Sequence, residues 1–234
     1  IDTLKIKNIS NNLKNWSDTV ESTVQADNSD TILELKNISF SYTGVDPIIN
    51  NVSFKLGKGE LIAIVGKNGA GKSTLSRLIC GFEKEDKGII SYFGKDISDL
   101  TIKERADKIG VVMQNPNQMI SKPLIFDEIA LGLRLRNINE EEIKIRVDKV
   151  LKVCGLAPFR KWPIAALSFG QRKRVTIASI LVLDPEVLIL DEPTAGQDFR
   201  HYSDIMKFVD EINQLGVAII LITHDMHLML EYAT

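Results

Sequence analysis

The chain has 234 residues, of which 44% are hydrophobic and 26% are charged, and its formal net charge is −2. This composition is typical of a globular domain with a buried core, and the near-neutral balance gives no electrostatic reason to expect nucleic acid as a partner. No apolar run approaches the roughly 18–20 residues that span a bilayer. The two cysteines, Cys80 and Cys154, lack the spacing of a metal site, so we expect buried, reduced thiols.

Residues 1–30 differ in composition from the rest of the chain. They are rich in Asn, Ser, Asp and Thr, and their one aromatic side chain is Trp16. Because no hydrophobic period is sustained there, we expect a linker or an N-terminal arm. The sequence predicts one further domain over residues 31–234.

Alternating apolar and polar residues begin at position 31. The alternation covers residues 32–36, 38–42 and 52–56, which predicts strands of a small antiparallel layer with one wet face. Residues 61–65 are apolar throughout. A strand covered on both faces has this pattern.

A glycine-rich loop follows that apolar run and matches the pattern G-x-x-x-x-G-K-[ST]. In such a loop, successive backbone N–H groups cradle phosphate oxygens, and the positive end of the next helix faces them. Lys72 adds a mobile charge for the outer phosphates, and Ser73 adds a hydroxyl for Mg²⁺. A chance glycine turn is the alternative, but the strand in front of the loop argues against it. The expected nucleotide contacts are Gly66, Asn68, Gly69, Ala70, Gly71, Lys72, Ser73 and Thr74.

The second half of the chain changes from strand to helix and back. Residues 109–113 form a buried strand pattern that ends at Gln114, and helical spacing follows over about 115–185. Residues 187–190 and 217–222 are again short apolar runs. We therefore expect an α/β fold of three layers: a phosphate-loop, RecA-like parallel-sheet core, a small antiparallel β layer and an all-α helical insertion.

Two acids follow the apolar run at 187–190. Asp191 and Glu192 come at the carboxyl end of a predicted parallel strand, where ligands bind in such sheets. Asp191 is suited to hold Mg²⁺, and Glu192 can accept a proton from an attacking water. A surface turn with two acids is the alternative, and the phosphate loop favours the functional interpretation.

A helix start signal occupies residues 167–171. Ser168 and Gln171 form an S-x-x-Q capping box, and Asn139 is a side-chain cap of an earlier helix with acids in its first turn. The simplest interpretation is a well-capped helix. The same start also presents free N–H groups, a hydroxyl and Gly170, all of which suit a phosphate.

In their order along the chain, these motifs resemble the ATP-binding cassette (ABC) ATPases over about residues 32–234. The five-residue segment at 167–171 separates this family from other phosphate-loop ATPases. Phe169 departs from the glycine that is most common there, and Gln197 departs from the usual leucine. The segments that carry the resemblance are the phosphate loop, Gln114, residues 167–171, Asp191-Glu192 and His224.

The resemblance implies a role for each matching residue. Tyr42 is expected to stack on adenine, and His224 to contact the γ-phosphate and orient Glu192. Ser168, Gly170, Gln171 and Asp198 are expected to act across a dimer interface. The implied catalytic residues are Glu192, His224 and Gln114, and the implied metal ligands are Ser73, Gln114 and Asp191.

Residues 114–119 and 167–175 narrow the resemblance to the ATPases of energy-coupling-factor importers, which take up vitamins or transition-metal ions. This implies ATP and Mg²⁺ as cofactors, a homo- or heterodimer of nucleotide-binding domains, and no nucleic acid. It also implies an integral-membrane scaffold subunit and, indirectly, a substrate-binding membrane subunit. The chain would then lie peripherally on the cytoplasmic face of the cell membrane. Residues 115–119 and the helix with Phe126, Ile129, Ala130 and Leu133 are expected to flank the groove for the scaffold.

Three other classes of protein contain the same type of ATPase domain. The ATPase subunit of an exporter is one alternative function. Chromosome and DNA-repair ATPases separate the two motifs by a long coiled coil, whereas Lys72 and Ser168 are 96 positions apart without heptads. Ribosome-associated cassettes carry a basic arm, whereas residues 1–30 contain three lysines. Because the family continues past the histidine with more strands, we expect the C-terminal part to be missing after Thr234.

Overall fold

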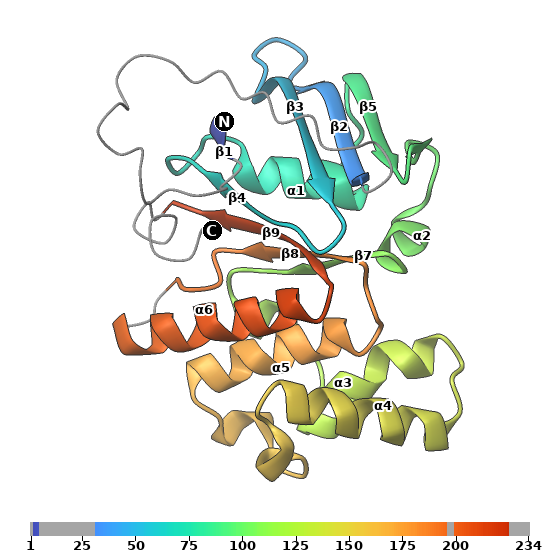
Figure 1. Ribbon diagram of the computed structural model, residues 1–234, viewed down its shortest axis with the longest axis vertical. Coiled ribbons are helices and arrows are strands. Elements are labelled where there is room, and N and C mark those ends of the chain that lie inside the picture. Colours follow the sequence, from blue (N-terminus) through green and yellow to red (C-terminus); the bar gives the residue numbers. More distant parts are fainter. Residues whose placement is uncertain (1, 5–30, 196–198, 225–234) are drawn as a thin grey trace.

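The computed structural model describes residues 2–4, 31–195 and 199–224, and two sheets dominate it (Figure 1). In the first sheet, four strands run parallel, and a short strand pairs antiparallel at one edge. Because parallel strands place their carboxyl ends at one edge, the loops that follow them gather there. The strand order is β1 (Asp2–Leu4), β4 (Leu61–Val65), β9 (Ala218–Thr223), β8 (Val187–Asp191) and β7 (Ile109–Val112).

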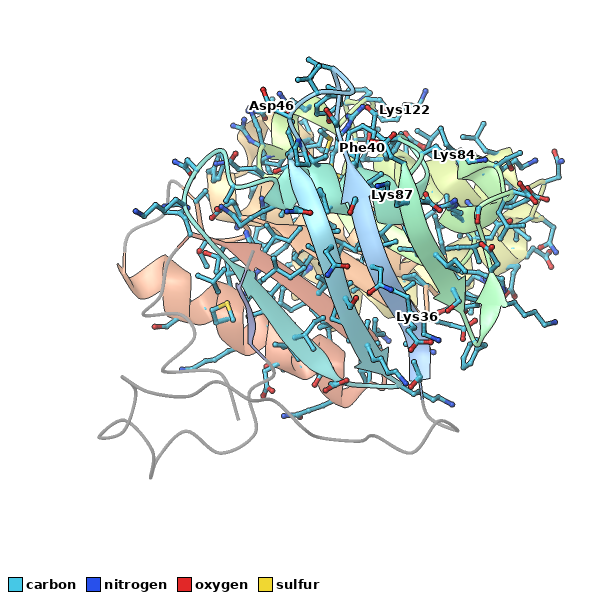
Figure 2. The ribbon with its side chains drawn as sticks, turned by 90° about the horizontal axis from the view of Figure 1, so that it is seen from above. Lys36, Phe40, Asp46, Lys84, Lys87 and Lys122 are labelled. Carbon is cyan, nitrogen blue, oxygen red and sulfur yellow. The ribbon has the colours of Figure 1, made fainter. Side chains whose placement is uncertain are left out.

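The second sheet is antiparallel. Its outer face carries charge: Lys36 and Lys55 lie 3.1 and 3.2 Å from Glu34, and Lys36 and Lys87 are exposed there (Figure 2). This is the solvent-exposed face that the alternation of apolar and polar residues predicts. The strand order is β3 (Ile49–Gly57), β2 (Thr31–Phe40), β5 (Lys87–Tyr92) and β6 (Lys95–Asp96).

The prediction of two strands at 32–36 and 38–42 is wrong. β2 is one strand, and its register shifts on both sides at Asn37, whose φ is 53°. One extra residue in a bulge bends the strand without ending it. β2 ends at Phe40, and Tyr42 lies in the loop beyond it.

Six helices complete the described part of the chain. Helix α1 packs between the two sheets, and α5 and α6 cover the opposite face of the parallel sheet, with α3 and α4 outside α5 (Figure 1). The region between β7 and β8 holds α3, α4, α5 and three short 3₁₀ turns. The helices are α1 (Lys72–Cys80), α2 (Ile102–Ala106), α3 (Ile125–Leu135), α4 (Glu140–Val153), α5 (Phe169–Leu181) and α6 (Phe199–Gln214).

The parallel sheet is buried on both faces. Ile189 and Ile220 face a core shared with α1 and the antiparallel sheet, whereas Leu188 and Leu221 face a core shared with the helices. Burial of each such side chain contributes roughly 1.5–3 kcal/mol, which explains why these strands are apolar without alternation. The three-layer α/β fold expected from the sequence is confirmed.

Three apolar residues of α3 belong to the core. Ile129, Ala130 and Leu133 are fully buried and fill the helical core, so these side chains do not face a docked partner, and the expectation that the helix flanks a groove stays a prediction. Phe126 is half-buried, with the Arg160 guanidinium 4.4 Å from its ring centre. The α3 spacing therefore reports the core and not a surface.

Both cysteines are free and buried, as the sequence predicts. Burial raises the pKa of the Cys154 thiol to about 12, so this sulfur stays protonated and inert at neutral pH. None of the helices in the described ranges combines the length and apolar character that a membrane span needs.

Candidate nucleotide-binding site

The phosphate loop leaves β4 and ends at Gly71, the N-cap of α1, whose φ is 86°. A Cβ at this position would lie 2.9 Å from the carbonyl oxygen of Ile48 and 2.9 Å from Cδ1 of Ile49, so only glycine fits. No side chain caps the first turn of α1. Its N–H groups are therefore available to an anion, and the helix dipole favours one there.

Lys72 provides the cation of this loop. Its side chain is 7% exposed, and Nζ donates to the carbonyl oxygens of Gly66 at 2.6 Å and Lys67 at 3.1 Å. The ammonium thus folds back over the loop that precedes it. These contacts hold a positive charge where phosphate oxygens would enter the cradle.

Ser73 and Asp191 meet although they are far apart in sequence. The Ser73 hydroxyl donates to Oδ2 of Asp191 at 3.1 Å, because β8 ends beside the start of α1. Burial raises the pKa of Asp191, and the charge of Glu192 raises it further, so a divalent cation would relieve this carboxylate. One hydroxyl and one carboxylate suit Mg²⁺, which completes its shell with phosphate oxygens and water.

Glu192 and His224 form the second pair. They follow the adjacent strands β8 and β9, and Nδ1 of His224 lies 2.8 Å from Oε1 of Glu192. Glu192 is 7% exposed and has a φ of 46°, a conformation held by its N–H donating to the Ile222 carbonyl at 2.8 Å. The Thr223 hydroxyl lies 3.4 Å from Oε2. The carboxylate is thus oriented by neighbours on the next strand.

A cavity of about 230 Å³ lies between the phosphate loop, the start of α1 and Glu192, and Asp191 and His224 do not line it. It brings together seven of the residues expected from the sequence, and Ile48, from the loop before β3, is an additional wall. The lining consists of Ile48, Asn68, Gly69, Gly71, Lys72, Ser73, Thr74 and Glu192.

Other expected site residues do not line that cavity. Tyr42 is 53% exposed and packs edge-on against Phe40, with ring centres 4.8 Å apart. Gln114 is exposed in the loop after β7. Asp198 lies outside the described residues. Ser168, Gly170 and Gln171 also stay apart from the cavity within one chain.

The start of α5 has the capping box that the sequence predicts. The Gln171 N–H donates to the Ser168 hydroxyl at 3.2 Å, and the Ser168 N–H donates to Oε1 of Gln171 at 2.9 Å. Phe169, the departure from the family pattern, is 38% exposed. The cap fixes the first turn of α5 and leaves the phenyl ring at the surface.

Sequence reasoning missed Lys173, a fully buried lysine on α5. Its Nζ donates to the carbonyl oxygens of Met113 at 3.0 Å and Gln114 at 2.5 Å. Burial lowers the pKa of Lys173 to about 8, although the charges of Asp191 and Glu192 act in the opposite direction. Because Arg172 and Arg174 flank Lys173, residues 172–174 look in the sequence like a charged segment exposed to solvent.

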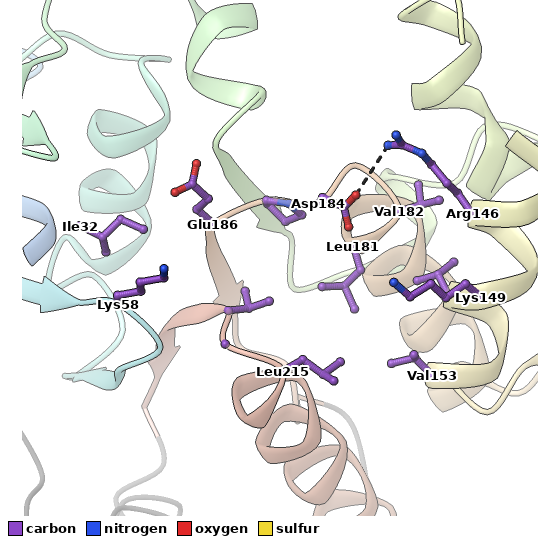
Figure 3. Close-up of a pocket in the computed structure, with 14 residues that line it drawn as sticks. Ile32, Lys58, Arg146, Lys149, Val153, Leu181, Val182, Asp184, Glu186 and Leu215 are labelled. Atoms are coloured by element: carbon purple, nitrogen blue, oxygen red, sulfur yellow. Dashed lines mark ion pairs between the residues drawn. The ribbon is translucent and has the colours of Figure 1, made fainter. Parts of the chain in front are cut away.

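A second cavity, of about 420 Å³, lies at the amino ends of β4, β8 and β9, at the opposite edge of the parallel sheet (Figure 3). Arg146 and Asp184 form an ion pair of 3.6 Å in its wall. None of the expected site residues within the described ranges lines it.

The fold and the site together define a phosphate-loop nucleotide-binding protein. Residues 49–195 match the ABC transporter family. The solved structure of cbiO1 from Clostridium perfringens, part of the ABC transporter complex cbiONQ, has a TM-score of 0.82 and 37% sequence identity to this chain. That match covers 87% of this chain and 82% of cbiO1. The chain therefore belongs to the ABC transporter ATPase family, whose cofactors are ATP and Mg²⁺.

The names of curated relatives agree with this family assignment. A protein of Clostridium perfringens (strain 13 / Type A), named as an ABC transporter ATP-binding protein, is 59% identical over 99% of this chain. Another with that name, from Enterococcus faecalis (strain ATCC 700802 / V583), is 60% identical over 91%. The chain spans 41% and 38% of the lengths of these two relatives. Their names give no substrate.

Proposed function

We propose that this chain is the ATP-hydrolysing nucleotide-binding subunit of a membrane importer of the energy-coupling-factor type, which takes up a vitamin or a transition-metal ion. The observation that carries the ATPase part is the Glu192–His224 pair, which lies beside a phosphate loop whose Ser73 contacts Asp191. A proton acceptor, a metal ligand set and a phosphate cradle are the parts that phosphoryl transfer to water requires.

Each residue has a separate task in this proposal. Lys72 and the N–H groups of α1 hold the phosphates, and Ser73 with Asp191 holds Mg²⁺. The bound ion supplies positive charge that offsets the charge developing on the transferred phosphoryl group. Glu192 accepts a proton from the attacking water at its carboxylate, and His224 orients that carboxylate.

The importer assignment is supported by cbiO1, which is part of the ABC transporter complex cbiONQ. By analogy, the partners are a second nucleotide-binding domain, an integral-membrane scaffold subunit and, through it, a substrate-binding subunit. The chain would lie peripherally at the cytoplasmic face. An exporter motor and a soluble cassette that acts on the ribosome or DNA are the alternatives.

ATP binding is tested with Lys72→Ala. Loss of the buried ammonium leaves the backbone cradle intact, so the fold should persist while MgATP affinity falls by roughly tenfold or more. The matched control is Lys67→Ala, which removes an exposed lysine of the same loop. Calorimetry measures both affinities. Equal affinity of a folded Lys72→Ala variant and the wild type would refute the assignment.

The membrane partner is tested by crosslinking. Asn117 is exposed and its side chain accepts from Arg172 at 3.3 Å, so it marks the surface beside the start of α5. Asn117→Cys and Ser121→Cys should capture the scaffold protein in membranes. Lys149→Cys, at the second cavity, is the control and should not capture the scaffold protein. Capture by the control alone would place the docking face elsewhere, and capture of a ribosomal protein would favour the soluble alternative.

A further inference from the structure

Lys173 combines full burial with a charged end group. It lies in the first turns of α5, five residues after the capping Ser168, and it is 0% exposed. It shares its helix face with Thr176 and Ile177, which are also fully buried. A lysine here is costly, because an apolar side chain of similar length would fill the space without burying a charge.

The ammonium joins α5 to the loop that follows β7. It donates to the carbonyl oxygens of Met113 and Gln114, the two residues that follow β7. Strand β7 pairs with β8, which ends in Asp191 before Glu192. Both carboxylates attract the ammonium. Lys173 therefore connects the helix that starts at Ser168 to the loop of Gln114, which follows the strand next to β8.

Two hydrogen bonds to adjacent carbonyls restrain the backbone at its turn out of β7. Gln114 itself is exposed, so no buried contact of its side chain does this. In the described part of the chain, the Met113 N–H contacts the Met119 sulfur at 3.2 Å, which is a weak interaction. The charge-assisted bonds from Lys173 are the stronger restraint on this loop.

We propose that Lys173 is a positioning residue that fixes the Gln114 loop against α5, so that a shift of α5 moves Gln114 relative to Asp191 and Glu192. The proposal rests on the ATPase function proposed above. Lys173 acts through the backbone of Gln114 and does not line the nucleotide cavity. Its removal should therefore lower kcat and leave KM and the affinity for MgATP unchanged.

The test compares Lys173→Met and Lys173→Arg with Lys144→Met in the full protein. Methionine keeps the length and removes the charge, arginine restores a charged donor, and Lys144 is an exposed lysine of α4. We expect Lys173→Met to lower kcat roughly tenfold to a hundredfold, as a displaced catalytic group does. Lys173→Arg should recover part of this loss, and Lys144→Met should match the wild type.

A second readout needs no turnover. Amide hydrogen exchange in residues 113–119 should accelerate in Lys173→Met, while exchange in α1 stays at the wild-type rate. Combining Lys173→Met with Gln114→Ala should give little further loss of kcat, because both changes remove the same positioning. If Lys173→Met does not fold, Lys173→Gln replaces it, since the amide keeps a donor without the charge.

The outcomes separate this inference from the proposed function. A folded Lys173→Met variant with wild-type kcat and wild-type exchange would overturn the role of Lys173 and leave the ATPase assignment intact. A fall in the stability and the nucleotide affinity of Lys173→Met with no change in kcat would also overturn the role of Lys173. Absence of ATP binding and hydrolysis in the wild type would instead overturn the proposed function.

Discussion

Glu192, the proposed proton acceptor, has a backbone conformation that its neighbours impose. Its φ of 46° lies in the left-handed region, which costs a residue with a Cβ about 1–3 kcal/mol and persists only where the surroundings impose it. The N–H bond to Ile222 and the contact with His224 impose it here. Both partners come from β9 or its end, so the conformation depends on the pairing of β8 with β9.

Glu192→Gln keeps the shape of this residue and removes its basicity. We expect ATP turnover to fall by roughly 10²- to 10⁴-fold, the range for loss of a general base, with MgATP affinity retained. Phosphate release and calorimetry measure the two quantities. Glu186→Gln, an exposed glutamate before the amino end of the same strand, is the control and should keep full turnover. Wild-type turnover in Glu192→Gln would exclude this carboxylate as the base.

At the same scale, the sequence locates the phosphate loop and the two acids because each motif is local. It does not locate Lys173, whose importance depends on which face of α5 is buried. It also misplaces Tyr42, since the alternation continues to residue 42 whereas β2 ends at Phe40. Such features depend on tertiary packing, which local patterns do not encode.

Helix α1 is held at both ends. Its amino end is the phosphate cradle, and at its carboxyl end Nη1 of Arg105 donates to the carbonyl oxygens of Leu78 at 2.9 Å and Ile79 at 3.1 Å. Arg105 is 3% exposed, and burial lowers its pKa. Gly81, with a φ of 79°, ends the helix, and a Cβ there would lie 3.0 Å from the Arg105 side chain. The guanidinium thus neutralises the negative end of the helix whose positive end is proposed to face phosphate.

Arg105→Met should destabilise the chain by about 2 kcal/mol, the cost of losing charged hydrogen bonds to buried carbonyls. This corresponds to a fall of roughly 4–8 °C in Tm for a domain of this size. Lys103→Met, an exposed change on the same short helix α2, is the control. Denaturant unfolding measures both variants. A Tm within 1 °C of the control, as a rough limit, would contradict the capping role.

Element boundaries show where local patterns suffice. The apolar run at 61–65 coincides with β4, and the one at 187–190 lacks only the last residue of β8. Strand β5 was not predicted, because only its second half is buried and it contains a glycine. Helix α2 spans five residues, too few for a hydrophobic period to emerge.

In the described part of the chain, the two helix starts that we expect to bind phosphate lie apart. Lys72 and Ser73 line the cavity, whereas Ser168 and Gly170 at the start of α5 do not. Both motifs are helix starts, which favour an anion, but α1 has no side-chain cap whereas Ser168 and Gln171 form a capping box at α5. A second chain placed with its α5 start opposite the cavity would complete the site, which is the arrangement implied by the family resemblance.

Mixing two inactive variants tests this arrangement. Lys72→Ala removes the cation of one half-site, and Ser168→Arg places a bulky side chain at the other. If each site combines Lys72 of one chain with Ser168 of its partner, a mixed dimer keeps one intact site. Equimolar mixing should then restore up to roughly one quarter of wild-type turnover, since half of the dimers are mixed and each has one of two sites.

Each variant alone should be inactive, which provides the baseline for the mixture. Ser168→Arg should still bind MgATP in calorimetry, because the phosphate loop of its own chain is unchanged. A mixture of Ser168→Arg with Glu192→Gln extends the test, since Glu192 lies in the same cavity as Lys72 and should complement in the same way. If both mixtures stay at the baseline while mixed dimers form, the two motifs do not share a site between chains.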